Sequence, residues 1–498
     1  MDINFSPINL TAQPTLVVGV LDERALTASA EAADDATDGA VRRALAVGRF
    51  TGKKDQTLSL AAPAGLGVDR IVLLGLGAPA KLDALAVQEA GGALVPALNA
   101  LGATQAAVAL DPLDGCPLEP AQLAANLVCG ARLRAYRFDK YRTKEKDDDK
   151  PTLAALIAMC VDPEAAEAGH TPLAAIAAGV EFTRDLVSEP ANVVYPESFA
   201  ERIEGLVSVG VDVEILDAAA MQKLGMGALL SVGDGSARES KLAVMRWNGA
   251  SDADAAPVAF VGKGVTFDTG GISLKPAGGM EEMKYDMAGA GCVAGLMKAL
   301  AGREARVNAV GVLGLVENMP SGNATRPGDV VTSMSGQTIE VINTDAEGRL
   351  VLSDALYYTR TRFKPQFMVD LATLTGAIVV SLGTYQAGLF CNDDDLAERI
   401  MGAGKSVGEN AWRMPLGERY DKDVNSEIAD MKNVGKGREA GSITAAQFLQ
   451  RFIGETKWAH LDIAGMAWCK KETALVPRGA AGFGVRLLDR LVADHYEG

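Results

Sequence analysis

The chain of 498 residues has few of the side chains that build histidine-ligated metal sites and disulfide frameworks, since it contains three histidines and six cysteines. The histidines, His170, His460 and His495, stand far apart, and no H-E-x-x-H motif is present. A histidine-ligated zinc protease is therefore excluded by ligand supply. The cysteines are scattered, with no C-x-x-C pair and no dense spacing, so we interpret them as reduced core residues.

The sequence also lacks long apolar runs and an excess of positive charge. No apolar stretch approaches the roughly 18 residues that span a bilayer, and the start, MDINFSPINL, has no signal-peptide pattern. We therefore expect a cytoplasmic protein without a membrane partner. Lys plus Arg total 48 against 64 for Asp plus Glu, a net charge of −16. Because this charge repels phosphate backbones, we expect no nucleic-acid partner, although it leaves room for a local basic patch.

The composition is that of a globular protein, with an apolar fraction of 48% and a charged fraction of 22%. At roughly 100–200 residues per domain, the length predicts at least two domains. Residues 1–170 alternate strand-like apolar runs with alanine-rich helical stretches, and residues 171–498 repeat this rhythm. Strands that alternate with helices predict two α/β domains. In such sheets ligands collect at the carboxyl ends of the strands.

Polar residues gather where one apolar run ends, in the segment VGKGVTFDTGGISLKP at 261–276. We expect the strand to end at Lys263 and a glycine-rich loop to carry Lys263 and Asp268, with Lys275 behind them. The glycines permit tight turns that aim these side chains inward. Asp286 follows in MEEMKYDMAGAG, at an expected helix.

A second polar segment, INTDAEGRLVLSDAL at 342–356, places Asp345 and Glu347 two residues apart before an expected helix that starts near Gly348. In an extended stretch, residues i and i+2 point the same way, so both carboxylates can face one centre. Negative charge is also favourable before a helix N-terminus.

Four carboxylates in one buried site, Asp268, Asp286, Asp345 and Glu347, would repel one another and lose hydration unless cations neutralised them. Two divalent metals satisfy this charge count better than one. Carboxylate-rich ligation without thiolates favours Mn, Mg or Zn.

Each of these residues alone has a structural explanation, since a lysine or aspartate beside a glycine turn is usually solvated or caps a helix. The metal site is predicted by the joint pattern. A rival motif, GKSVG at 404–408, matches G-x-S-x-G and offers Ser406 as the nucleophile of a serine hydrolase. The segment before it has a helical pattern, whereas a nucleophile elbow requires a strand.

The segment NTDAEGRL at 343–350 is identified as the signature of the leucine (cytosol) aminopeptidase family, peptidase family M17. Further stretches that resemble this family are the 261–276 segment, MKYDMAGAG at 283–291, DLATLTGA at 370–377, GREAGSITAAQFLQRF at 437–452 and WAHLDIAG at 458–465. The resemblance covers most of residues 180–498, and residues 1–170 resemble the family's amino-terminal domain loosely.

The resemblance implies a macro-domain-like α/β domain over 1–170 and a larger catalytic α/β domain over 171–498, with a mixed sheet covered by helices, in a homohexamer. It implies two divalent ions, Mn or Zn, bridged by Asp268 and Glu347. Lys263 and Asp286 would complete one metal site, and Asp345 the other.

The resemblance also implies hydrolysis of peptides with a free amino terminus, preferably leucine or another apolar residue. A metal-bridging water would attack the scissile carbonyl, Lys275 would stabilise the oxygen that gains charge, and Arg349 would hold bicarbonate as general base. The implied substrate-binding residues are Lys275, Met283, Asn343, Thr373, Leu374 and Gly376. Some bacterial members of the family also bind DNA, so a DNA-binding regulatory role is the other alternative besides the serine hydrolase.

Overall fold

The computed structural model describes residues 1–11, 13–437 and 439–497. The chain divides into two compact units, the first formed by Met1–Ala177 with Lys471–Arg478 and the second by Ala178–Lys470 with Gly479–Gly498. The division falls inside a continuous helix, α5 (Pro163–Ser188), and the short segment 471–478 joins the first unit. A helix that continues through the division leaves no linker-like pattern in the sequence.

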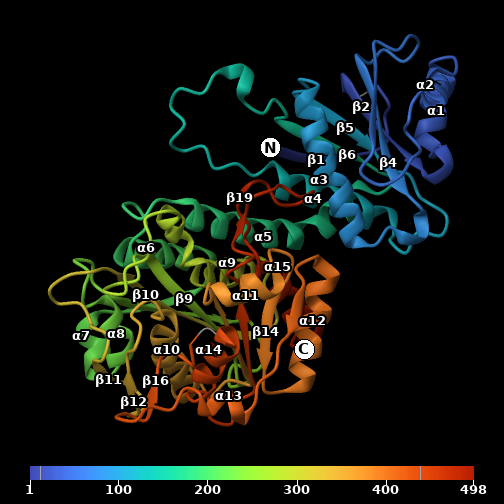
Figure 1. The fold of residues 1–498 in the computed structure, drawn as a ribbon. Coiled ribbons are helices and arrows are strands. Elements are labelled where there is room, and N and C mark those ends of the chain that lie inside the picture. Colours follow the sequence, from blue (N-terminus) through green and yellow to red (C-terminus); the bar gives the residue numbers. More distant parts are fainter. Residues whose placement is uncertain (12, 438, 498) are drawn as a thin grey trace. The chain divides into compact units, whose positions relative to one another are not determined.

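The first unit is a six-stranded sheet covered by helices (Figure 1). Its strand order is β1 (Asp2–Ser6), β6 (Ala155–Met159), β5 (Gln105–Ala109), β2 (Thr15–Leu21), β4 (Arg70–Gly77) and β3 (Thr57–Ala61). All neighbours are parallel except β3 and β4. One apolar core joins a face of the sheet to α1 (Ala28–Ala36) and α2 (Ala40–Val47), and another joins the opposite face to α3 (Ala84–Ala100) and α4 (Pro120–Ala135).

The second unit is built on an eight-stranded mixed sheet. Its strand order is β15 (Ala411–Arg413), β14 (Ala387–Cys391), β17 (Trp458–Asp462), β13 (Phe367–Ala372), β9 (Val258–Asp268), β10 (Asn308–Asn318), β8 (Lys241–Asn248) and β7 (Asp212–Leu216). The central strands β17, β13, β9 and β10 are parallel, whereas β14 and β8 run antiparallel to their central neighbours. Together the two units confirm the predicted α/β class.

Helices cover this sheet on both faces. One apolar core joins the sheet to α8 (Gly227–Gly233), α10 (Gly348–Phe363) and α14 (Gly441–Gln450), while α9 (Ala288–Gly302), α12 (Asp394–Val407) and α15 (Val485–His495) pack together against the strands. Successive residues of a strand point to opposite faces. Accordingly Val261 belongs to the core that contains α10, whereas Gly262 faces Ala290 of α9. Among the described residues, no helix combines the length and the apolarity needed to cross a membrane.

The remaining elements include the strands of two small sheets, one three-stranded and one two-stranded. They are η1 (Asp22–Arg24), η2 (Pro79–Lys81), η3 (Asp147–Asp149), η4 (Gly205–Val209), η5 (Met280–Tyr285), α6 (Pro196–Glu204), α7 (Ala218–Lys223), α11 (Gly376–Leu382), α13 (Glu418–Lys422), β11 (Val330–Thr332), β12 (Thr338–Glu340), β16 (Met431–Lys432), β18 (Trp468–Cys469) and β19 (Gly479–Ala480).

The carboxyl ends of the four central parallel strands lie at one edge of the sheet, because parallel strands all end on the same side. Polar residues stand at these ends: Asp268 closes β9, Asn318 closes β10, and Asp462 closes β17. Thr373 follows the last residue of β13. This edge is where ligands are expected in α/β sheets.

A buried carboxylate on α10 links this helix to neighbouring segments. Asp354 is fully buried, and its side chain accepts hydrogen bonds from Leu229 N at 2.8 Å and from Met334 N at 2.7 Å. Burial raises the pKa of Asp354 to about 7, although the backbone donors act in the opposite direction. The folded protein therefore holds this proton at a pH where an unfolded aspartate has lost it.

This difference predicts a pH-dependent contribution to stability. The folded pKa of Asp354 is above its unfolded value of 3.8, so the contribution is full below about pH 4 and is lost as the pH rises through about 7. The free energy of unfolding of the parent should fall relative to that of Asp354→Asn by roughly 2–4 kcal/mol over this window. Urea unfolding of both proteins in chelator between pH 4.5 and 8 checks this, and a difference that stays constant with pH would contradict it.

Candidate metal centre

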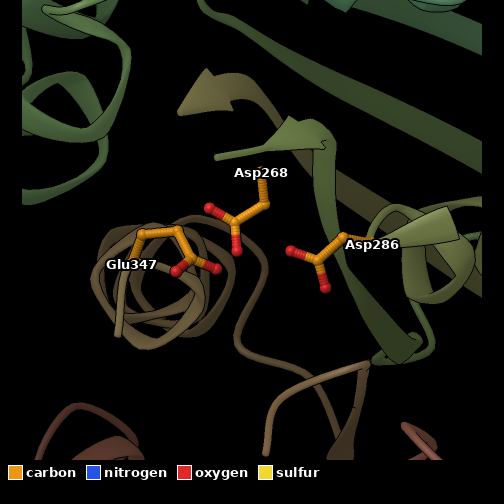
Figure 2. Close-up of side chains that lie close together, drawn as sticks. All are labelled: Asp268, Asp286 and Glu347. Atoms are coloured by element: carbon orange, nitrogen blue, oxygen red, sulfur yellow. The ribbon is translucent and has the colours of Figure 1, made fainter. Parts of the chain in front are cut away.

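Three buried carboxylates meet at the carboxyl edge of the central strands (Figure 2). Asp268 ends β9, Asp286 lies between η5 and α9, and Glu347 is the N-cap residue of α10. One oxygen of each lies within 4.8 Å of the others, and each residue is at most 5% exposed. Because buried like charges repel and have lost their hydration, such a group needs cations beside it.

Lys263 is one of these cations. Its Nζ lies 2.8 Å from Asp286 Oδ2 and 2.8 Å from Glu347 Oε1, and it donates to the carbonyl oxygen of Thr373 at 2.9 Å. A Cβ atom on Gly348 would lie 2.7–2.8 Å from the last three atoms of the Lys263 side chain, so any larger residue here would displace the lysine. The prediction that the strand ends at Lys263 is wrong: β9 continues to Asp268, because it stays paired with β10.

Lys275 is the second cation, and it connects the fourth carboxylate to the other three. Its Nζ lies 2.6 Å from Asp268 Oδ2 and forms an ion pair with Asp345. The extended geometry predicted for 345–347 is wrong, because this segment forms a turn in which Asn343 Oδ1 accepts from Asp345 N at 2.9 Å. Asp345 therefore pairs with Lys275, whereas Glu347 pairs with Lys263.

The two lysines and four carboxylates shift one another's pKa values. Burial and repulsion from Glu347 raise the pKa of Asp268 to about 6, and burial raises the pKa of Asp286 well above its usual range. Burial also acts to raise the pKa of Glu347, but Lys263 and Lys275 together lower it below its usual value. Burial acts to lower the pKa values of both lysines, but the surrounding carboxylates hold them above the usual range.

The charge balance of this cluster leaves room for added cations. Two ammonium groups face four carboxylates, so ionised carboxylates leave an excess of two negative charges in a buried site. Glu347 Oε2 is buried and has no hydrogen-bond donor among the described residues. An orphaned carboxylate oxygen within an oxygen-rich, negatively charged group fits hard or borderline divalent ions.

Arg349 lies on the first turn of α10, two residues after Glu347. It is 7% exposed, and its Nη1 donates to the carbonyl oxygen of Asn433 at 2.7 Å. Burial lowers the pKa of Arg349 to about 10. Its Nε is buried and has no acceptor within the described parts of the chain. The guanidinium is thus held through Nη1, while its Nε remains available as a hydrogen-bond donor.

Of the predicted substrate-binding residues, Met283 and Asn343 lie on the segments that carry the ligand candidates, whereas Thr373, Leu374 and Gly376 lie directly after β13. Thr373 contacts the cluster twice, since its Oγ1 donates to Asp286 Oδ1 at 2.7 Å and its carbonyl oxygen accepts from Lys263. The carbonyl oxygen of Met283 accepts from Asp286 N at 3.4 Å. Leu374 N donates to Asp462 at 3.1 Å, and Gly376 begins α11.

Several polar residues that support the site were missed by sequence reasoning. Asn318 and Asp462 are buried polar residues at the ends of apolar strands, which is the same signal that singled out Asp268. Asn433 is fully buried and holds the turn at 343–347, since its Nδ2 donates to the carbonyl oxygen of Asn343 at 2.7 Å and its Oδ1 accepts from Ile342 N at 2.8 Å. Nothing local in the sequence indicates this pairing, because the partners are about ninety residues apart.

Comparison with known proteins covers both units. Residues 181–489 match the model described as "Cytosol aminopeptidase family, catalytic domain", and residues 17–145 match that family's N-terminal domain. A probable cytosol aminopeptidase of Caulobacter vibrioides is 57% identical over 100% of both chains. Another, from Bradyrhizobium sp., is 54% identical over 99% of this chain and 98% of its own.

Two solved structures share the whole fold. The bottromycin maturation enzyme BotP in complex with Mn superposes with a TM-score of 0.84 at 34% identity, covering 97% of this chain and 99% of that one. A mutant tomato leucine aminopeptidase superposes with a TM-score of 0.85 at 34% identity, covering 99% and 96%. The resemblance found in the sequence is confirmed: the chain belongs to the cytosol aminopeptidase family of metal-dependent aminopeptidases.

Proposed function

We propose that this chain is a two-metal aminopeptidase that removes leucine and other apolar residues from the amino terminus of peptides. The observation that carries the proposal is the cluster in which four carboxylates, three of them buried, face only two lysines. Its carboxylate-rich chemistry supports Mn or Zn as the ions. BotP, which is 34% identical to this chain, has been solved in complex with Mn, and this supports Mn as an ion of the proposed site.

Asp268 and Glu347 would bridge the two ions. Lys263 and Asp286 would complete one metal site, and Asp345 would complete the other. Lys263 holds a proton in the absence of metal, since its pKa is above the usual range. A dication within bonding distance makes the neutral amine the favoured form, so binding at this site releases a proton.

When bound, the two ions supply a water of lowered pKa and polarise the scissile carbonyl. Lys275 is held by Asp268 and Asp345 at the edge of the cluster, where its ammonium can donate to the carbonyl oxygen as that oxygen gains negative charge. Arg349 has an unused, buried Nε donor that suits a small anion. We assign to Arg349 the role of holding a bicarbonate ion, which would supply a general base at this position.

Substrate selectivity would arise on the segments around the cluster. Met283, Thr373 and Gly376 line the pocket for the amino-terminal side chain, and Asn343 and Leu374 complete the substrate-binding surface. The double contact of Thr373 with Asp286 and Lys263 supports its place in this pocket. By the same family resemblance, we propose that the enzyme is a cytoplasmic homohexamer.

The serine hydrolase alternative gains no support from the position of Ser406. This residue lies within α12, and its hydroxyl donates to the carbonyl oxygen of Ala403 at 2.8 Å. A nucleophile elbow requires a sharp turn between a strand and a helix.

Removal of the metal should abolish turnover. Hydrolysis of a leucine chromogenic amide should fall by at least roughly a hundredfold after chelation, because the ions supply several kcal/mol of stabilisation to the transition state. Adding Mn or Zn back should restore the activity. Hydrolysis that persists unchanged in the chelated protein, and is lost in Ser406→Ala, would contradict the metal mechanism.

Loss of either proposed catalytic side chain should separate turnover from metal content. Lys275→Ala and Arg349→Ala should each lower kcat by roughly 10²–10³ while both ions remain bound, since neither residue is a proposed ligand. Kinetics and elemental analysis of the same samples check this. Lys241→Ala, which removes an ion pair with the half-exposed Glu239, serves as the control and should leave both readouts unchanged. Loss of metal from Lys275→Ala or Arg349→Ala would assign that residue a role in holding the ions.

A further inference from the structure

Asn318 is a buried amide at the end of β10, directly beside the proposed bridging ligand Asp268. The two residues are paired in register where β10 meets β9, after a register shift between Val316 and Asn318. Such irregularities re-aim a side chain relative to a regular strand. Asn318 is 4% exposed, so its polar atoms need partners within the protein.

The side chain uses both of its amide hydrogens on the proposed metal site. Asn318 Nδ2 donates to Asp268 Oδ1 at 2.8 Å and to the carbonyl oxygen of Thr344 at 3.0 Å. Both partners are acceptors only, so the amide nitrogen, not the oxygen, must face them. Thr344 immediately precedes Asp345, and Asn318 therefore ties the ligand at the end of β9 to the turn that carries the ligand Asp345.

Neighbouring residues hold both the backbone and the side chain of Asn318 in place. The backbone carbonyl of Asn318 accepts from Thr269 N at 3.0 Å and from Thr269 Oγ1 at 2.8 Å. On the other side, a Cβ atom at Gly271 would lie 2.7 Å from Asn318 Oδ1, and Gly271 has a φ of +65°. Only glycine satisfies both conditions, so the backbone packs directly on the amide oxygen.

The amide in turn determines how Asp268 is presented. Asp268 Oδ1 accepts two hydrogen bonds, from Asn318 Nδ2 and from Gly270 N at 2.9 Å, which leaves Oδ2 to face Lys275. We propose that Asn318 is a positioning residue for metal binding, which holds Asp268 and the Thr344–Asp345 turn at a fixed separation. The inference rests on the proposed metal function. Groups that hydrogen-bond to metal-ligating carboxylates typically contribute about 10–100-fold to metal affinity.

The same strand provides a matched control. Asn308 is the first residue of β10, is 6% exposed, and donates through Nδ2 to the carbonyl oxygens of Asp252 and Ala255, each at 3.1 Å. It is therefore a buried asparagine that bonds to a loop, as Asn318 does, but at the opposite end of the strand. Replacing either residue with alanine removes buried hydrogen bonds, but only Asn318 is bonded to a proposed metal ligand.

Calorimetric titration of the metal-free full chain with Mn²⁺ tests the proposal. Asn318→Ala should weaken Mn²⁺ binding by roughly 10–100-fold, whereas Asn308→Ala should change it by less than about threefold. Thermal unfolding in chelator should show a lower Tm for both variants. Equal Mn²⁺ affinity of the parent and Asn318→Ala, or an equal loss in both variants, would overturn the proposal.

Two further outcomes are distinguishable. If the parent itself binds no Mn²⁺, the proposed metal function fails, and the role of Asn318 fails with it. If Asn318→Ala does not fold, the Mn²⁺ affinity of Asn318→Ser is measured in its place, because serine keeps one hydroxyl donor. We expect this variant to bind Mn²⁺ more weakly than the parent but more tightly than Asn318→Ala would, because one donor is kept. An affinity equal to that of the parent would overturn the proposal.

Discussion

The second unit depends on how the negative charge buried at one edge of its central sheet is neutralised. Asp268, Asp286 and Glu347 converge there with little exposure to solvent, and Asp345 joins them through Lys275. Lys263 and Lys275 neutralise part of this charge, and the carboxylates that they face raise their pKa values. Because two ammonium groups cannot neutralise four carboxylates, the same arrangement favours divalent ions.

The fold keeps these charges together by ending four parallel strands at one edge. The last residues of β9, β10 and β17 are Asp268, Asn318 and Asp462, and each makes side-chain hydrogen bonds to a neighbouring loop or strand end. The N-cap position of α10 adds Glu347, where the helix dipole favours negative charge. Asp268, Glu347 and the supporting residues Asn318 and Asp462 are thus positioned by strand ends and a helix start, whereas Asp286 and Asp345 lie in turns.

Much of this could be predicted from the sequence, because glycines and carboxylates follow apolar runs in segments that match a family signature. Asp268 and Glu347 were found in this way. The turn at 343–347 could not be predicted, since it depends on Asn433, about ninety residues away. The length of β9 depends on pairing with β10, and the return of residues 471–478 to the first unit depends on tertiary packing. A single sequence contains no direct signal for such long-range contacts.

The number of metal ions per chain tests the central claim most directly. Elemental analysis of the parent, after equilibration with Mn and removal of free ions, should give two ions per chain. Glu347→Gln should retain one or none, because the substitution removes the charge of the proposed bridging ligand. A parent that holds no stoichiometric metal, or a Glu347→Gln protein that still holds two ions, would contradict the account.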